Sequence, residues 1–274
     1  MIRTLKLGLT IIGSLLIALP AFAVPTLQVG APGSGGGYAS YTTYLTDPIE
    51  NDTAIVTGSP FTLLVAGAYK QNNYLLLGGK FDGALPYPAG NDWSFFGFNT
   101  AFNGAGAVLM VTVPDGTLGS GGITIGGAPP IYSTGTWLGG FVVPNPPSNH
   151  APIPDQDYLF FDIGDFTKSV VPVVPNFADP ADPEGLKLGQ VKTLDVTITG
   201  FEWAHFDVLA LLSQWDRQRV GGVWVYNTIT SVQGNPGSHD ATWNSVSVPE
   251  PSTVLLLGAG LVGFGVFARR RRVK

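Results

Sequence analysis

The sequence predicts an all-β protein, folded as a β-sandwich or a jelly-roll-like domain. Three observations lead to this prediction: the apolar segments are short, turn residues separate them (37 glycines and 22 prolines), and only 12% of the 274 residues are charged. Short strands between frequent Gly and Pro turns are typical of sandwiches and jelly rolls. The alternative is an α+β domain with a helix over 203–218, because the aromatic and leucine side chains there also fit one helical face.

In the first half of the chain, strand patterns follow a glycine-rich turn at 34–37. Residues 38–44 combine tyrosines with β-favouring threonines. Residues 61–69 and 74–77 are apolar and flank a short polar stretch, which predicts a hairpin. Residues 106–113 form an apolar run ended by a Pro-Asp-Gly turn, so we expect a central strand there.

The second half repeats these signals. Residues 123–125 alternate between two glycine pairs, and 158–163 is a short apolar strand. Residues 193–201 and 221–232 alternate apolar and polar side chains, which indicates strands with one buried face. A turn before a terminal strand is expected at 235–240. Proline-rich loops are expected at 144–154 and 170–185.

The C-terminal segment, 249–274, contains three consecutive signals. Pro249, Glu250 and Pro251 precede an uncharged apolar run at 254–268. As a transmembrane helix this run spans about 22 Å, short for a bilayer core of about 30 Å. Arginines that follow it mark the cytoplasmic side. These are Arg269, Arg270, Arg271 and Arg272.

In content, order and position, this segment resembles the PEP-CTERM sorting signal of Gram-negative bacteria. The resemblance implies recognition by an exosortase, cleavage near Pro249, Glu250 and Pro251, and transfer from a transient stage in the inner membrane to the cell surface or extracellular matrix. The alternative is a permanent transmembrane anchor formed by the same helix. The segment is less than a tenth of the chain, so it predicts a destination and not the role of the cargo.

The N-terminal segment, 1–23, has the pattern of a signal peptide. Arg3 and Lys6 are followed by an apolar stretch at 7–19, and the small residues Ala21 and Ala23 form an A-x-A site. We expect signal peptidase to cut after Ala23, which leaves residues 24–248 as one exported cargo domain. A membrane anchor is the alternative, but the apolar stretch is short for that role.

Composition excludes several classes of function. The chain has no cysteine, so disulfides and thiolate metal sites are absent. Seven of the 14 basic residues and one of the 19 acidic residues lie in the two terminal segments. The cargo therefore has seven basic against 18 acidic residues, a net charge of −11. This charge argues against nucleic acid as a partner.

The densest carboxylate group is not expected to bind calcium. A strand over 158–163 would place Asp157 and Asp162 on opposite faces, and the loop lacks the glycine and glutamate of an EF-hand. We therefore expect no metal and no cofactor. The carboxylates considered are Asp155, Asp157, Asp162 and Asp165, and a weaker set is Asp179, Asp182 and Glu184.

Catalytic signals are weak, and we expect no enzyme. His150, His205 and His239 have no zinc-binding spacing around them. Ser238 and Asp240 flank His239, but triad members normally come from distant segments, and no Gly-x-Ser-x-Gly elbow exists. A secreted hydrolase remains an alternative.

Tryptophan and phenylalanine side chains make a carbohydrate-binding module the other alternative, although core packing is their commoner role. The residues concerned are Trp93, Phe95, Phe96, Phe98, Trp137, Trp203, Trp215, Trp224 and Trp243.

Residues 203–207 (Trp-Ala-His-Phe-Asp) and 238–243 (Ser-His-Asp-Ala-Thr-Trp) are similar to the choice-of-anchor families, choice-of-anchor N in particular. That resemblance implies a β-rich surface domain and assigns no functional residues. The expected function is thus that of a structural surface or matrix protein, associated with a biofilm or exopolysaccharide.

Ala23→Arg should block removal of the signal peptide, because a large cation at this position does not fit a small-residue cleavage site. We expect a larger precursor held in the membrane. Mass spectrometry of the N-terminus checks this, and an intact Met1 on the wild-type surface form would contradict the predicted cleavage.

Overall fold

The structure is a computed structural model, and it describes residues 25–69, 75–77, 93, 98–102, 104–135, 153–182 and 185–245. These residues form strands and one short 3-10 helix, η2 (Thr100–Phe102). The strands are β1 (Leu27–Gly30), β2 (Tyr41–Tyr44), β3 (Glu50–Thr57), β4 (Phe61–Tyr69), β5 (Leu75–Leu77), β6 (Ala107–Val113), β7 (Gly122–Ile125), β8 (Tyr132–Thr134), β9 (Asp157–Asp162), β10 (Leu188–Thr199), β11 (Trp203–Val220), β12 (Val223–Gly234) and β13 (Asp240–Asn244).

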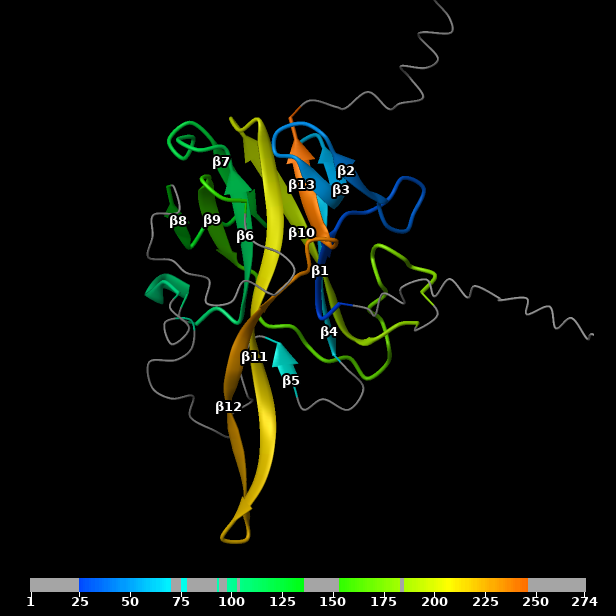
Figure 1. Ribbon diagram of the computed structural model, residues 1–274, viewed down its shortest axis with the longest axis vertical. Helices are drawn as coiled ribbons and strands as arrows, with labels where there is room; N and C mark the ends of the chain where they lie inside the picture. The colour runs from blue at the N-terminus through cyan, green and yellow to red at the C-terminus, as the bar shows by residue number, and fades with distance from the viewer. Residues whose placement is uncertain are drawn as a thin grey trace, which may run out of the picture.

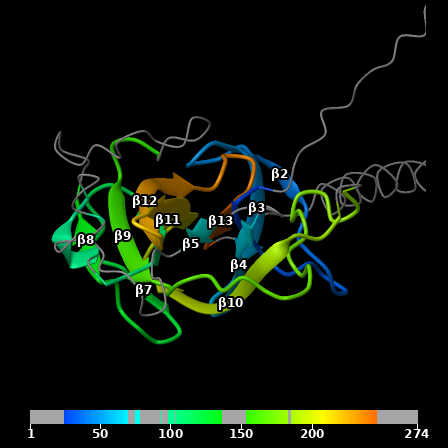
Figure 2. The same ribbon diagram turned by 90° about the horizontal axis from the view of Figure 1, so that it is seen from below.

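Two sheets form a sandwich, which confirms the predicted fold class. The smaller sheet has the order β1-β4-β10-β7. The larger has the order β2-β3-β13-β11-β6-β9-β8, and β12 and β5 also pair with β11. Within these sheets β13 and β3 are parallel neighbours, whereas the other pairs are antiparallel. Figure 2 shows β4, β10 and β7 as one layer and β11 and β13 on the other side of the core.

The main core lies between the two sheets. Phe61 of the smaller sheet meets Phe206 of the larger one, with ring centroids 5.9 Å apart. Burial of such apolar surface is the main favourable term in folding. Other buried members of this inter-sheet core are Leu27, Val29, Leu63, Val65, Ile123, Val196, Ile198, Leu109, Val111, Phe161, Val208, Ala241 and Trp243.

A second apolar cluster lies on the other face of the larger sheet, opposite the inter-sheet core. It includes Trp93, Phe102, Met110, Tyr158 and Phe160. Because this cluster and the inter-sheet core enclose β6, every residue of β6 is buried. The predicted central strand at 106–113 is therefore confirmed, and its continuous apolar run has a physical reason.

The region 203–218 is a strand and not a helix. Along β11, Phe206 and Val208 pack into the inter-sheet core, and Leu209 and Leu211 pack into the second cluster. Apolar residues on both faces produced the pattern that also fitted a helix. Figure 1 shows β11 and β12 continuing together beyond the sandwich to a turn at the far end. That turn is Gly221-Gly222, and both residues have positive φ, as a tight hairpin turn requires.

The predicted hairpin of 61–69 with 74–77 is wrong. β4 pairs with β1 and β10 in the smaller sheet, whereas β5 pairs with β11 in the larger one. The β4–β10 ladder extends over all nine residues of β4, and β5 has only three residues to offer. The longer ladder with β10 outweighs the pairing that is closer in sequence.

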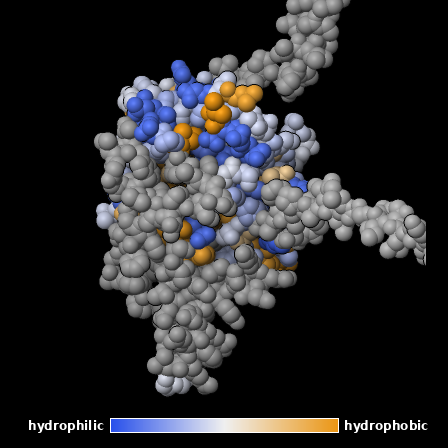
Figure 3. All heavy atoms as spheres, in the orientation of Figure 1, coloured by the Kyte–Doolittle hydropathy of each residue, from blue (hydrophilic) through white to orange (hydrophobic). Residues whose placement is uncertain are grey.

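Other predictions are confirmed. β7 occupies the alternating segment at 123–125, and in β10 Val196 and Ile198 are buried while their neighbours are exposed. The turns at 34–37, after β6 and before β13 are present. On the face seen in Figure 3, hydrophilic residues gather at the end of the sandwich opposite the hairpin turn.

No helix within the described ranges is long and apolar enough to cross a bilayer. The predicted signal peptide at 1–23, the sorting residues Pro249, Glu250 and Pro251, and the predicted transmembrane helix at 254–268 lie outside the described residues.

Gly67→Ala should destabilise the sandwich. A Cβ at Gly67 of β4 would lie 2.5 Å from the buried Phe166 ring. The backbone of Phe166 accepts a hydrogen bond from Tyr69 at 2.9 Å, so the ring has little room to move. We expect a loss of about 2 kcal/mol, or roughly 4–8 °C in Tm, in thermal unfolding.

Gly122→Ala is the matched control. It lies in β7, where a new Cβ meets nothing closer than Thr199 Oγ1 at 3.5 Å. Its Tm should stay within about 2 °C of wild type. Equal effects of the two substitutions would contradict the steric argument.

Candidate functional site

Charged and polar side chains are buried together on the outer face of the larger sheet, away from the inter-sheet core. The group includes His205 and Asp207 of β11, Asp240 and Thr242 of β13, and Thr53 of β3. Each is at most 2% exposed. Burial of ionisable groups is costly unless they interact with one another or with a cation, so this polar cluster is the strongest candidate for a functional site.

Strand alternation places the polar cluster. On β11, Phe206 belongs to the inter-sheet core, so His205 and Asp207 project from the opposite face. On β13, Ala241 and Trp243 belong to that core, and the residues that alternate with them project outward. Thr242 pairs with His205 across the ladder, which brings the two outward rows together.

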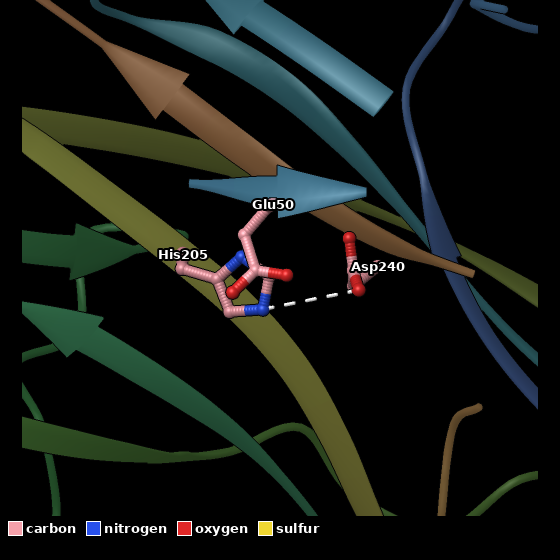
Figure 4. Close-up of side chains that lie close together, drawn as sticks. All are labelled: Glu50, His205 and Asp240. Atoms are coloured by element: carbon pink, nitrogen blue, oxygen red, sulfur yellow. Dashed lines mark ion pairs between the residues drawn. The ribbon is translucent and has the colours of Figure 1, made fainter. Parts of the chain in front are cut away.

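Glu50 of β3 joins the polar cluster through a β-bulge. Thr42 and Tyr44 lie two apart on β2, but their partners on β3, Thr53 and Glu50, lie three apart. The extra residue in β3 places the Glu50 side chain on the same face of the sheet as Thr53. Asp52, which lies between these two residues, has a φ of 57°. Figure 4 shows Glu50, His205 and Asp240 directed toward one another.

His205 is at the centre. Its Nδ1 lies 3.0 Å from Thr242 Oγ1, which lies 2.9 Å from Thr53 Oγ1. Its Nε2 lies 3.4 Å from Asp207 Oδ2 and 3.9 Å from Asp240 Oδ2. Nδ1 is thus held by hydroxyl groups, while Nε2 faces the carboxylates.

Three of these residues offer potential metal-ligand atoms that lie close together. Glu50, His205 and Asp240 each offer one nitrogen or oxygen atom, and these atoms lie within 4.8 Å of one another. His205 and Asp240 are fully buried, whereas Glu50 is only half-buried. The group is therefore closest to solvent at Glu50.

Asn235 holds Asp207 in place. The Asn235 side-chain amide donates to Asp207 Oδ1 at 3.0 Å, and its oxygen accepts from the Val208 amide at 2.7 Å.

On the Asp240 side, burial and the nearby Asp240 carboxylate raise the pKa of Tyr41 well above its usual value. The Tyr41 hydroxyl donates to the Val29 carbonyl.

The predicted turn before the terminal strand positions His239. Asn176 Oδ1 accepts from the Ala178 amide at 3.1 Å, so this oxygen is an acceptor for His239 Nε2–H at 2.8 Å. His239 Nδ1 then accepts from Ser238 Oγ at 2.9 Å. Burial lowers the pKa of His239 to about 4. Ser238 and His239 are thus hydrogen-bonded to each other, and His239 is also hydrogen-bonded to Asn176. Asp240 does not join this group but belongs to the separate polar cluster.

Among the carboxylates considered for calcium, Asp157 and Asp162 do not share a site. Asp157 is buried and accepts from the Thr117 and Leu118 amides at 2.9 and 3.2 Å. Asp162 is exposed and accepts from the Gly164 amide at 2.8 Å, so the predicted opposite faces are confirmed. These two carboxylates hold local turns. In the weaker set, Asp182 Oδ2 accepts from Asn176 at 3.3 Å, and Glu184 lies outside the described residues.

Of the aromatic side chains considered for glycan binding, those that the structure describes pack inside the protein. Trp93, Trp203, Trp243 and Phe98 are all at most 5% exposed. The Trp93 indole donates to the Ala105 carbonyl at 2.6 Å, which satisfies its polar group without a ligand. The other aromatic residues considered for glycan binding lie where the structure describes no side chains, as does His150.

Sequence reasoning did not find the polar cluster. Its members come from three distant segments, and no local spacing joins Glu50 and Asp240 to His205 and Asp207. One signal was present: residues 203–207 and 238–243, singled out for another reason, contain His205, Asp207 and Asp240.

Comparison with known proteins identifies the C-terminal segment. Residues 247–272 match the PEP-CTERM protein-sorting motif. This match supports an exported bacterial protein that exosortase sorts to the cell surface, as the sequence predicted. The resemblance to choice-of-anchor N has no support from the comparisons.

No curated protein matches the chain. One solved structure, titled "AvmM Catalyzes Macrocyclization in Alchivemycin A Biosynthesis", is similar at 11% identity over 77% of this chain and 98% of that chain. Its TM-score of 0.27 is too low to support a conclusion about fold or activity.

Acidification should destabilise the protein through His239. Unfolded histidine takes up a proton near pH 6.5, whereas His239 in the fold does so only near 4. The unfolded state therefore binds more protons between these values, and stability falls as the pH drops through them. Between pH 7.5 and 4.5, the free energy of unfolding of the wild type, measured in urea, should fall by roughly 2–3 kcal/mol more than that of His239→Gln. Parallel losses in the two proteins would contradict this.

Proposed function

We propose that this protein is a structural component of the cell surface or extracellular matrix of a Gram-negative bacterium, delivered by signal peptidase and exosortase and acting without catalysis. The observation that carries the proposal is the sorting motif at 247–272. It begins shortly after β13, the strand that completes the sandwich at Asn244. A folded β domain followed by a sorting segment is the arrangement expected of exported cargo.

The way β13 is held supports a structural role. It pairs with β3 over 240–244 and with β11 over 241–244, so it is hydrogen-bonded on both sides. Its Ala241 and Trp243 side chains pack into the inter-sheet core. The segment that leads to the sorting motif therefore leaves from the interior of the larger sheet and not from a loose edge.

We further propose that the surface role is association with exopolysaccharide in a biofilm matrix. The acidic cargo and the absence of cysteine suit an extracellular, well-solvated protein. No specific observation favours the carbohydrate-binding module or the hydrolase: the described tryptophans are buried, and His239 is bonded to Ser238 and Asn176.

Replacement of Pro249, Glu250 and Pro251 by alanine should leave the protein in the inner membrane, because the extended segment that exosortase reads would be lost. We expect at least a tenfold loss of surface-released protein, measured by immunoblot of fractions. Pro129→Ala with Pro130→Ala, in the connection from β7 to β8, controls for loss of proline elsewhere.

The C-terminal peptide of the released wild-type form provides the direct test. Mass spectrometry should find it without residues 254–274. A released form that retains these residues would show that the segment is a plain anchor.

A further inference from the structure

The charge balance of the polar cluster favours a bound cation. Glu50, Asp207 and Asp240 surround one imidazole, that of His205. Even a protonated His205 would leave two negative charges among these four groups. Three of the four are at most 2% exposed. Buried carboxylates of like charge avoid this cost by pairing with a positive charge or by binding a proton or a metal ion.

The orientation of His205 favours the metal ion. A metal ion on Nε2 requires the tautomer with the proton on Nδ1, and Thr242 Oγ1, which lies 3.0 Å away and in turn bonds Thr53, can accept this proton. This tautomer directs the Nε2 lone pair toward Asp207 and Asp240. A lone pair that faces carboxylate oxygens is repelled by them, whereas a cation between them attracts both. An outer hydrogen bond that fixes the other ring nitrogen is usual for metal-binding histidines.

The distances agree with this interpretation. The Nε2–Asp240 Oδ2 separation of 3.9 Å is too long for a charge-assisted hydrogen bond. Two ligands at about 2.1 Å from one ion lie roughly 3.0–3.5 Å apart. Side-chain movements of up to about 0.9 Å each would bring Glu50, His205 and Asp240 from within 4.8 Å to this range.

We propose that Glu50, His205 and Asp240 bind one divalent transition-metal ion, Zn²⁺ or Mn²⁺, in the folded cargo domain. Asp207, held by Asn235, lies beside the site, where its carboxylate would accept a hydrogen bond from a water on the ion. The ion links β3, β11 and β13 in a protein that has no disulfide. This proposal is independent of the sorting function, and it replaces the sequence-based expectation that the protein binds no metal.

Ligand chemistry selects the ion. Imidazole together with carboxylates suits Zn²⁺ and Mn²⁺, whereas Ca²⁺ takes six to eight oxygen ligands and Mg²⁺ prefers octahedral oxygen. With three protein ligands, a tetrahedral ion keeps a fourth position for water. Glu50 is the most exposed ligand, so the ion enters on its side.

The test uses the exported protein, stripped with EDTA and dialysed. Elemental analysis of the untreated protein should find about one Zn or Mn per chain. EDTA should lower Tm by roughly 5–10 °C, and 100-fold excess of Zn²⁺ or Mn²⁺ over Kd should restore it, whereas Ca²⁺ should not. Co²⁺ should bind at the same site and give visible absorption bands.

Glu50→Gln should weaken Zn²⁺ binding at least tenfold and reduce the Co²⁺ bands, because an amide is a poorer ligand than a carboxylate. Glu202→Gln is the matched control, since Glu202 is exposed and precedes β11 by one residue. His205→Gln provides a second variant should Glu50→Gln not fold, and it should abolish the Co²⁺ bands.

Three results would overturn the proposal. The first is metal far below one equivalent with a Tm insensitive to EDTA and Zn²⁺, which would indicate a protonated His205 in place of a metal. The second is wild-type Zn²⁺ affinity in both Glu50→Gln and His205→Gln. The third is a loss of Zn²⁺ affinity in Glu202→Gln equal to that in Glu50→Gln, which would indicate that Zn²⁺ binds elsewhere.

Discussion

The backbone hydrogen bonds along β11 are the interaction on which the larger sheet depends. Its first half pairs with β13 on one side and β6 on the other, and its later residues pair with β5 and β12. One strand therefore joins the parallel pair of β3 and β13 to the central strands β6 and β9. Few other arrangements of these segments could satisfy so many backbone groups at once.

The register of β11 is fixed by its two different faces. A slip of one residue would move His205 and Asp207 into the inter-sheet core, and it would expose Phe206 to the outer face. The free energy needed to bury ionised groups in that apolar core would exceed any gain from the shifted pairing. The two different faces of β11 therefore disfavour a pairing that is shifted by one residue.

Local and linear features were predictable from the sequence. The alternation around Val196 and Ile198 and the apolar run of β6 gave strands in the right places, and the C-terminal motif could be recognised because its residues are contiguous. Long-range pairing was not predictable, since the partner of β4 is 188–196 and not the neighbouring segment. The polar cluster was missed for the same reason. It also depends on a bulge at Asp52, and the turn-forming types Asn51 and Asp52 do not by themselves indicate a change of face inside a strand.

The parallel pairing of β13 with β3 has a mechanical consequence. The sorting motif follows the end of β13 in the sequence, so tension applied at this end would enter the domain through that strand. Such a pull loads the hydrogen bonds to β3 and β11 in shear, all together, where an edge hairpin would open one bond at a time. Attachment at this end would therefore place the load on a strand that is hydrogen-bonded on both sides.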